Sequence, residues 1–210
     1  MRLPIAIALS MAALLAADKP EKGFTALFNG KDLTGWEKAK ENEGTFAIKD
    51  GAIVANGPRC HLYYTGPFKN HEFKNFELKV DVMTQAKSNG GIYFHTGYQE
   101  KGWPDKGFEV QVNNSHGDWR KTASLYMVQD NKEAVAEDGK WFTEHIIVQG
   151  DHVQVFVDGK KITDWTQPAG FKGPNKDMVG RFLQSGTFAL QGHDPGSTVA
   201  YKNIRVKPLK

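Results

Sequence analysis

Two neighbouring segments of the chain, residues 89–95 and 107–114, concentrate side chains that can exchange protons or bind hydroxyl groups. Their candidate functional residues are Tyr93, His95, Glu109, Gln111 and Asn113. A carboxylate or an imidazole can act as a general base, and carboxamides and a phenol can hydrogen-bond hydroxyl groups. This set favours a site for a polyhydroxylated ligand in which either Glu109 or His95 is the base.

A period-two pattern predicts that these polar side chains share one face of a β-sheet. Successive side chains of a strand point to opposite faces. The first strand then presents Tyr93 and His95 on one face, and the second presents Glu109, Gln111 and Asn113 on the matching face. Outward side chains of paired strands lie about 5 Å apart, near enough to share one substrate.

Further candidates lie downstream and in loops. Gln191 and His193 share one parity in a later segment, so we expect them on the same face, with His193 as a catalytic acid or electrophile. The residues around His193 are also typical of an ordinary turn. Trp103 and Trp119, in loops beside the paired strands, are candidates for stacking on a sugar. The residues expected to bind substrate are therefore Tyr93, Gln111, Asn113, Trp103, Trp119 and Gln191.

A divalent metal is an open alternative. His95, Glu109 and His193 together offer the mixed nitrogen and oxygen shell that such an ion takes, although no pair of them has a diagnostic spacing. The sequence requires no other cofactor. Cys60 is the only cysteine, so no internal disulfide can form, and we expect a buried thiol because no third group orients it as a nucleophile.

The composition favours one all-β domain. The 210 residues include 22 glycines and 9 prolines, which indicate many turns, and outside the N-terminus no segment has a sustained apolar repeat of helical period. The net charge is only +3 and the lysines are scattered, so we expect no nucleic-acid partner.

The N-terminus resembles a secretory signal sequence. Residues 1–17 contain an early arginine, an apolar stretch over residues 3–15 and two small residues before the charged Asp18. The apolar stretch is too short to span a bilayer comfortably. We expect cleavage and export to the periplasm or the exterior, with a mature domain over residues 18–210 and no integral membrane segment. A retained N-terminal anchor is the alternative.

About a dozen short strands are predicted in the mature chain. They cover residues 24–28, 46–49, 52–55, 62–64, 76–83, 89–95, 107–114, 124–128, 145–149, 152–157, 161–164, 187–191 and 199–206. Asp50-Gly51, Gly150-Asp151 and Asp158-Gly159 are tight-turn signals between consecutive strands. Strands at this spacing favour a two-sheet sandwich.

The inward positions of these strands define the expected core. They are Phe76, Leu78, Val80, Val82, Ile92, Phe94, Phe108, Val110, Val112, Ile146, Val148, Val153, Val155, Val157, Phe188, Leu190, Ile204 and Val206. A slip of one residue would expose a whole strand's apolar set, so the register is strongly specified.

Five motifs in order resemble one known family. Residues 24–36, 89–94, 107–111, 152–159 and 192–206 are similar to the 3-keto-disaccharide hydrolase domain, formerly a domain of unknown function. The resemblance covers nearly all of the mature chain. It implies a concanavalin A-like jelly-roll sandwich of two antiparallel sheets and an exported enzyme that cleaves oxidised glycosides. His95 departs from the family pattern, which more often has arginine there.

The acid content of the paired strands fits a keto sugar better than an ordinary glycoside. A conventional glycosidase uses two carboxylates, whereas the strand over residues 107–114 offers only Glu109. A second acid would have to come from a loop, from Glu100, Asp105 or Asp118. A C3 ketone makes the C2 hydrogen acidic, so one base and one electrophile can expel the C1 substituent by β-elimination, and hydration completes a net hydrolysis. Direct displacement stays open.

Two other functions are compatible with the same residues. A non-catalytic carbohydrate-binding module of the same fold would keep the aromatic and amide side chains but would not need Glu109. A domain that only mediates protein contacts would present an exposed apolar patch rather than a polar cleft.

Overall fold

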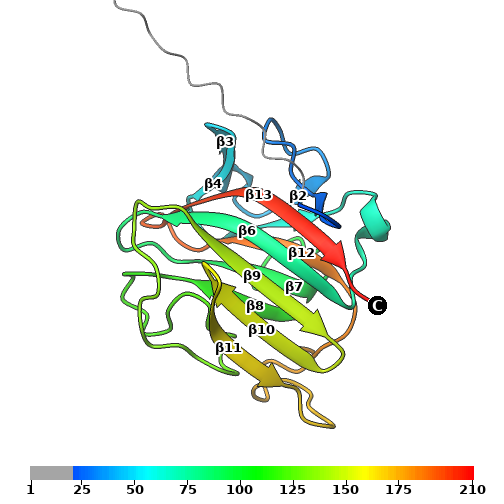
Figure 1. Cartoon of the computed structure of the whole chain (residues 1–210). Coiled ribbons are helices and arrows are strands. Elements are labelled where there is room, and N and C mark those ends of the chain that lie inside the picture. The colour runs from blue at the N-terminus through cyan, green and yellow to red at the C-terminus, as the bar shows by residue number, and fades with distance from the viewer. Residues whose placement is uncertain (1–20) are drawn as a thin grey trace, which may run out of the picture.

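The computed structural model describes residues 21–210, so the expected signal sequence at residues 1–17 lies outside the described part. The chain forms two antiparallel sheets packed face to face (Figure 1). The eight-stranded sheet has the order β11-β10-β9-β6-β13-β4-β3, with β1 pairing with β13. The five-stranded sheet has the order β2-β5-β12-β7-β8. Within residues 21–210 no helix is long and apolar enough to span a membrane.

The secondary structure is almost entirely strand. In chain order the elements are β1 Thr25–Ala26, β2 Trp36–Lys38, η1 Glu43–Thr45, β3 Phe46–Lys49, β4 Ala52–Asn56, β5 Cys60–Tyr64, η2 Phe68–His71, β6 Phe76–Thr84, β7 Gly90–Thr96, β8 Phe108–Val112, β9 Phe142–Gln149, β10 His152–Val157, β11 Lys160–Thr166, β12 Thr187–Gly192 and β13 Thr198–Pro208. Both η elements are short 3-10 turns.

The tight turns predicted from sequence join the expected hairpins. Asp50 and Gly51 both have positive φ and connect β3 to β4, as a two-residue turn between right-twisted strands requires. Asp158 and Gly159 do the same between β10 and β11. The strand predicted over residues 124–128 is wrong, because that segment turns back on itself and keeps only isolated bridges at Leu125.

The apolar core lies between the two sheets and confirms the predicted parity. Every residue of the predicted core set is buried, and together with its neighbours the set forms one continuous hydrophobic cluster. In the small sheet, β7 and β8 pair so that Ile92 lies opposite Val110 and Phe94 opposite Phe108. These apolar side chains face the large sheet, which leaves the other face of β7 and β8 for polar residues.

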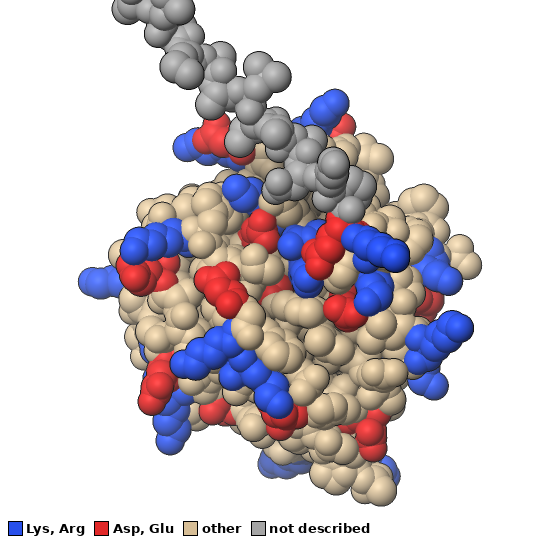
Figure 2. All heavy atoms as spheres, viewed as in Figure 1, with Lys and Arg blue, Asp and Glu red and all other residues tan. Residues whose placement is uncertain are grey.

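The two outer faces of the sandwich differ. Half-buried charged residues line the outer face of β6 and β13, where Glu77 pairs with Lys207, and Arg205 with Asp81. Figure 2 shows acidic and basic side chains interspersed over this face of the molecule. The outer face of the small sheet is instead covered by loops, so that β5, β7, β8 and β12 are buried on both sides. A polar face enclosed in this way is suited to a ligand.

Candidate active site

Strand register places the polar side chains of the small sheet in two rows. One row runs across β5, β12, β7 and β8 through Tyr63, Ala189, Tyr93 and Glu109. The next row runs through His61, Gln191, Gly91 and Gln111. Partners opposite each other in a sheet point to the same face. The predicted shared face for Tyr93, Glu109, Gln111 and Gln191 is therefore confirmed.

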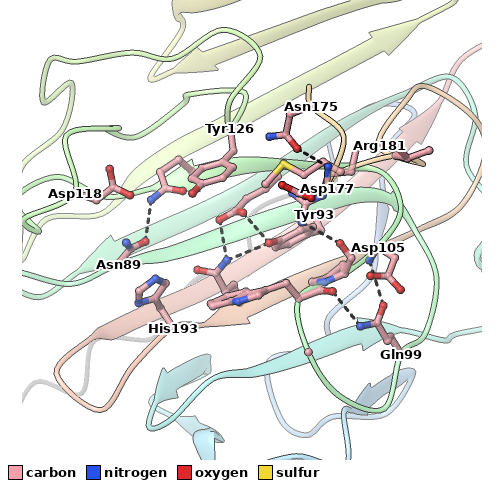
Figure 3. Close-up of a pocket in the computed structure, with 18 residues that line it drawn as sticks. Asn89, Tyr93, Gln99, Asp105, Asp118, Tyr126, Asn175, Asp177, Arg181 and His193 are labelled. Carbon is pink, nitrogen blue, oxygen red and sulfur yellow. Dashed lines mark hydrogen bonds between the residues drawn. The ribbon is translucent and has the colours of Figure 1, made fainter. Parts of the chain in front are cut away.

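A cavity of about 800 Å³ lies above these rows (Figure 3). Its floor is formed by Tyr93, Glu109, Gln111 and Gln191, and its walls by loops from residues 99–105, 118–126 and 175–181. This volume lies within the range of small-ligand sites in proteins. Its lining is rich in amides, carboxylates and aromatic rings, as recognition of a hydroxylated ligand requires.

Glu109 is the buried carboxylate of the cavity floor. Its Oε2 accepts a hydrogen bond from the Tyr93 hydroxyl at 2.7 Å, and its Oε1 accepts one from Gln191 Nε2 at 2.7 Å. Burial raises the pKa of Glu109, and the hydrogen bond from Tyr93 and the charge of Arg181 act in the opposite direction. Gly91 makes room for this carboxyl group, because a Cβ there would lie 2.7 Å from Oε1. The result is a carboxyl group whose orientation is fixed and whose pKa is raised.

The amides beside Glu109 keep hydrogen-bonding capacity for a ligand. Gln111 donates from Nε2 to Asn89 Oδ1 at 2.9 Å. Within residues 21–210 the Oε1 atoms of Gln111 and Gln191 are buried and have no hydrogen-bond partner. Buried polar atoms are normally paired. Both glutamines line the cavity, and their unpaired oxygens are acceptors that the described part of the protein leaves unused.

Arg181 brings a cation to the cavity and was missed from the sequence. The residue is buried, it lies over the Tyr93 ring with its guanidinium carbon 5.9 Å from the ring centroid, and its Nη2 donates to Pro104 O at 3.0 Å. A guanidinium has five N–H donors, and this hydrogen bond to Pro104 uses only one of them. No local pattern marks this arginine, because it comes from a loop rich in Gly and Pro between β11 and β12.

His193 follows β12 directly and lines the cavity, as its parity predicted. Its Nδ1 lies 2.7 Å from Asp194 Oδ2. Its ring contacts Trp103 and His116, with centroid distances of 5.6 and 5.7 Å. The turn expected as the alternative is also present, since Ser197 N donates to Asp194 O. His193 therefore belongs to a turn and faces the cavity.

The prediction that His95 shares the face of Glu109 is wrong. On β12, Ala189 and Thr187 are two positions apart, but their partners on β7, Tyr93 and Thr96, are three positions apart. The strand β7 therefore has one extra residue here, and His95 has a φ of 56°. This bulge reverses the direction of the His95 side chain. Its ring packs against Phe76 and Phe94, and its Nε2 lies 2.9 Å from Lys74 O. Burial lowers the pKa of His95 to about 4, so it is a neutral structural histidine.

The remaining predicted binding residues divide between the cavity and its surroundings. Trp103 lines the cavity, whereas Trp119 does not and lies under the guanidinium of Arg120. Asn113 is also outside the cavity, because its Nδ2 donates to the carbonyl oxygens of Asp118 and Arg120 and so holds the following loop. For Trp119 and Asn113 the expected contact with substrate is not supported.

Of the loop acids considered as a second carboxylate, Asp105 and Asp118 line the cavity, but Glu100 forms an ion pair with Lys40 outside it. Neither aspartate is fully buried. The trio considered as an alternative metal site is not assembled, because His95 lies on the other side of the sheet. Across residues 21–210 no group of three or more His, Cys, Asp or Glu side chains is placed to hold a metal ion.

Cys60 is a buried thiol, as expected. It is fully buried on β5, and burial raises its pKa to about 11. A thiol of this kind is not a nucleophile at neutral pH. The groups that can do chemistry in the cavity are therefore the buried carboxylate of Glu109, the more exposed carboxylates of its loops, two phenols, the guanidinium of Arg181 and the imidazole of His193.

Comparison with known proteins shows which family the sequence matches. The sequence profile of the 3-keto-alpha-glucoside-1,2-lyase-like domain matches residues 23–207. A 3-keto-disaccharide hydrolase of Bacteroides thetaiotaomicron is 26% identical over 232 residues, covering 89% of this chain and 79% of that protein.

Two solved structures share the architecture. A protein of Parabacteroides distasonis to which glycosyl hydrolase activity is ascribed has a TM-score of 0.72 at 23% identity, covering 90% of this chain and 94% of that one. An endo-beta-1,3(4)-glucanase of family GH16 has a TM-score of 0.55 at 12% identity, covering 89% and 91% of the two chains. These similarities confirm the predicted concanavalin A-like jelly roll.

Proposed function

Because the chain belongs to the 3-keto-alpha-glucoside-1,2-lyase-like domain family, we propose that it cleaves 3-keto-disaccharides and related 3-keto-glycosides. One observation carries the proposal: the cavity holds one buried carboxylate, Glu109, together with Arg181 and His193. A conventional glycosidase needs a pair of carboxylates. A 3-keto sugar needs one base, one electrophile and one acid, which is what this cavity offers.

The first step we propose is removal of the C2 proton by Glu109. Its carboxylate takes the proton, and the electron pair of the C–H bond forms a C2=C3 double bond while the ketone oxygen becomes an enolate. Tyr93 and Gln191 hold both carboxylate oxygens, so the base is oriented before substrate binds. Burial raises the pKa of Glu109, which strengthens it as a base.

The developing enolate needs a donor. Arg181 is the buried cation that lines the cavity, and its charge acts on both Tyr93 and Glu109. Hydrogen bonds from a fixed cation to an oxyanion stabilise the transition state strongly in a buried site. We assign Arg181 to the ketone oxygen of the substrate.

The second step expels the substituent at C1. The enolate returns to a ketone, a C1=C2 double bond forms, and the bond from C1 to the glycosidic oxygen breaks. His193 in its protonated form donates a proton to the departing oxygen. Addition of water to the double bond then places hydroxyl on C1 and hydrogen on C2, which gives a 3-keto sugar and completes a net hydrolysis.

The proposal is tested with 3-keto-trehalose in D2O, with trehalose as the unoxidised control. We expect sugar release from the keto substrate alone, with deuterium at C2 of the released 3-keto sugar by mass spectrometry and NMR. Glu109→Gln should abolish release, and Glu100→Gln, at an exposed carboxylate outside the cavity, should not. Equal release from trehalose, or full activity of Glu109→Gln, would contradict it.

The same measurements distinguish the competing functions. A binding module would bind the sugar in the wild type and in Glu109→Gln alike and release nothing from any 3-keto substrate. Direct displacement would release sugar without deuterium at C2 beyond the level of an enzyme-free control. We further infer export to the periplasm or the exterior from residues 1–17, which detection of the shortened chain outside the cytoplasm would test.

A further inference from the structure

We propose that Asp194 is the positioning residue of His193: it holds the Nδ1–H of the imidazole so that Nε2 is the nitrogen presented to the leaving-group oxygen. The inference rests on the proposed function, because it concerns the acid of the same reaction. It assigns a role to a side chain that does not line the cavity.

The contact between the two side chains is direct. Asp194 Oδ2 lies 2.7 Å from His193 Nδ1. An ionised carboxylate only accepts hydrogen bonds, so this contact requires a hydrogen on Nδ1. Within residues 21–210 no hydrogen bond engages Nε2 of His193. The carboxylate therefore selects one tautomer and leaves Nε2 free to give or take a proton.

Asp194 is itself held in its ionised form. Ser197 Oγ donates to Oδ2 at 2.7 Å, and Gly196 N donates to Oδ1 at 2.8 Å. Although burial acts to raise it, the pKa of Asp194 is lowered by these bonds and by the one from His193. The carboxylate thus stays an acceptor on both oxygens at neutral pH.

The hydrogen bonds continue from Asp194 to the floor of the cavity. Ser197 Oγ accepts from Asn89 N at 2.9 Å, and Asn89 Oδ1 accepts from Gln111 Nε2 at 2.9 Å. A chain of four hydrogen bonds therefore links His193 to β8, the strand that carries the base. A turn that served only to connect β12 to β13 would not need this link.

Aromatic neighbours fix the plane of the imidazole. The ring of His193 contacts the rings of Trp103 and His116 at interplanar angles of 41° and 63°. Figure 3 shows His193 at the edge of the same cavity as Asn89 and Tyr93. With the plane set by its neighbours and the rotation set by Asp194, the imidazole has one orientation toward the ligand.

The proton balance of the elimination agrees with this arrangement. Imidazolium His193 carries hydrogens on both nitrogens. It gives the Nε2 hydrogen to the oxygen that leaves C1, and the electron pair of that N–H bond stays on Nε2. The neutral ring that remains has its hydrogen on Nδ1, which is the tautomer that Asp194 already holds, so no rotation or second proton transfer is needed.

The test compares two leaving groups in wild type and Asp194→Asn. With 3-keto-trehalose, whose alkoxide must be protonated as it departs, we expect kcat to fall about 100-fold with little change in KM. With 4-nitrophenyl 3-keto-glucoside, whose phenolate needs no proton, we expect a rate near that of the wild type. Ser197→Ala, which removes one donor to Asp194, should produce the same selective loss on a smaller scale.

A second measurement does not depend on activity. Nitrogen-15 NMR of the histidine rings should report hydrogen on Nδ1 of His193 in the wild type and a mixed tautomer in Asp194→Asn. Equal losses on both substrates, or an Nε2–H tautomer in the wild type, would overturn the assignment. If the wild type cleaved neither substrate, the proposed function itself would fail, and the NMR result would still decide whether Asp194 orients the ring.

Discussion

The hydroxyl of Tyr93 donates to the carboxylate of Glu109 over 2.7 Å, between two residues that lie directly opposite each other on β7 and β8. The hydrogen bond joins the two members of one cross-strand pair, so the sheet itself sets the orientation of the carboxylate. Gln191 reaches the other carboxylate oxygen from β12. Three adjacent strands thus hold one functional group, and the site is as rigid as the small sheet.

The pH dependence of the reaction should follow Glu109. Because burial raises the pKa of this carboxyl group, the base form is lost at a higher pH than for an exposed glutamate. We expect kcat/KM for 3-keto-trehalose to fall on the acid side with a midpoint above 4.5, the usual value for glutamate. Asp105→Asn, at an exposed rim carboxylate, should leave that midpoint unchanged, and a midpoint at or below 4.5 would contradict the assignment.

The alternation of side chains along the strands predicted much of the site correctly. Where that prediction was wrong, the cause is physical. Glu109, Gln111 and Gln191 were placed correctly because alternation along a strand leaves only two choices of face. His95 was placed wrongly because one extra residue in β7 and a left-handed backbone reverse its side chain. A regular alternation of residues gives no sign of such a bulge.

Arg181 and Asp194 could not be placed from the sequence for a different reason. Arg181 reaches the cavity through a loop whose path depends on contacts with Pro104, 77 positions away. Asp194 is one residue from His193 and was available as a signal, but its role depends on the side-chain rotation that Ser197 fixes. Side chains on loops are positioned by tertiary contacts rather than by period.

Two exposed tryptophans offer a matched test of the cavity. Trp103 lines it, whereas Trp119, of similar exposure, lies outside. Trp103→Ala should raise the KM for 3-keto-trehalose by roughly 2- to 12-fold, as loss of about 0.5–1.5 kcal/mol of aromatic contact implies. Trp119→Ala should leave KM unchanged. The prediction fails if the two variants shift KM equally under steady-state conditions.

His95→Ala should affect stability rather than chemistry. The imidazole packs on Phe76 and Phe94, its Nε2 lies 2.9 Å from Lys74 O, and its Nδ1 accepts from Gln184 N at 3.3 Å. Removing a buried ring with two hydrogen bonds should cost about 2–4 kcal/mol of unfolding free energy. Urea unfolding measures this loss.

The control for His95 is His152→Ala, at a partly exposed histidine on β10 whose ring pairs with Asp164. It should cost much less stability. At a temperature where His95→Ala is fully folded, its kcat should stay close to the wild-type value. A kcat loss as large as that of Glu109→Gln, with unchanged stability, would restore His95 to the catalytic machinery.

Glu144 predicts how the stability of the sandwich changes with pH. This carboxyl group is fully buried on β9 between the sheets, where Oε1 accepts from Ala123 N at 3.2 Å and Oε2 has no partner within residues 21–210. Burial therefore raises its pKa well above the usual glutamate value of 4.5. The folded protein holds this proton more tightly than the unfolded chain does.

The sign of the effect follows from that difference. The stability that neutral Glu144 provides is fully present below pH 4.5, and it declines as pH rises from 4.5 toward the raised pKa, by at most about 1.4 kcal/mol per pH unit. Glu144→Gln keeps the shape without the charge, so its unfolding free energy should equal that of the wild type at pH 4 and exceed it increasingly above pH 5. Glu137→Gln, at an exposed carboxylate, should show no such divergence in urea titrations at each pH. If the unfolding free energies of the wild type and Glu144→Gln changed with pH in parallel, Glu144 would have to have a charged partner. Only a carboxylate compensated in this way could ionise at that depth without loss of stability.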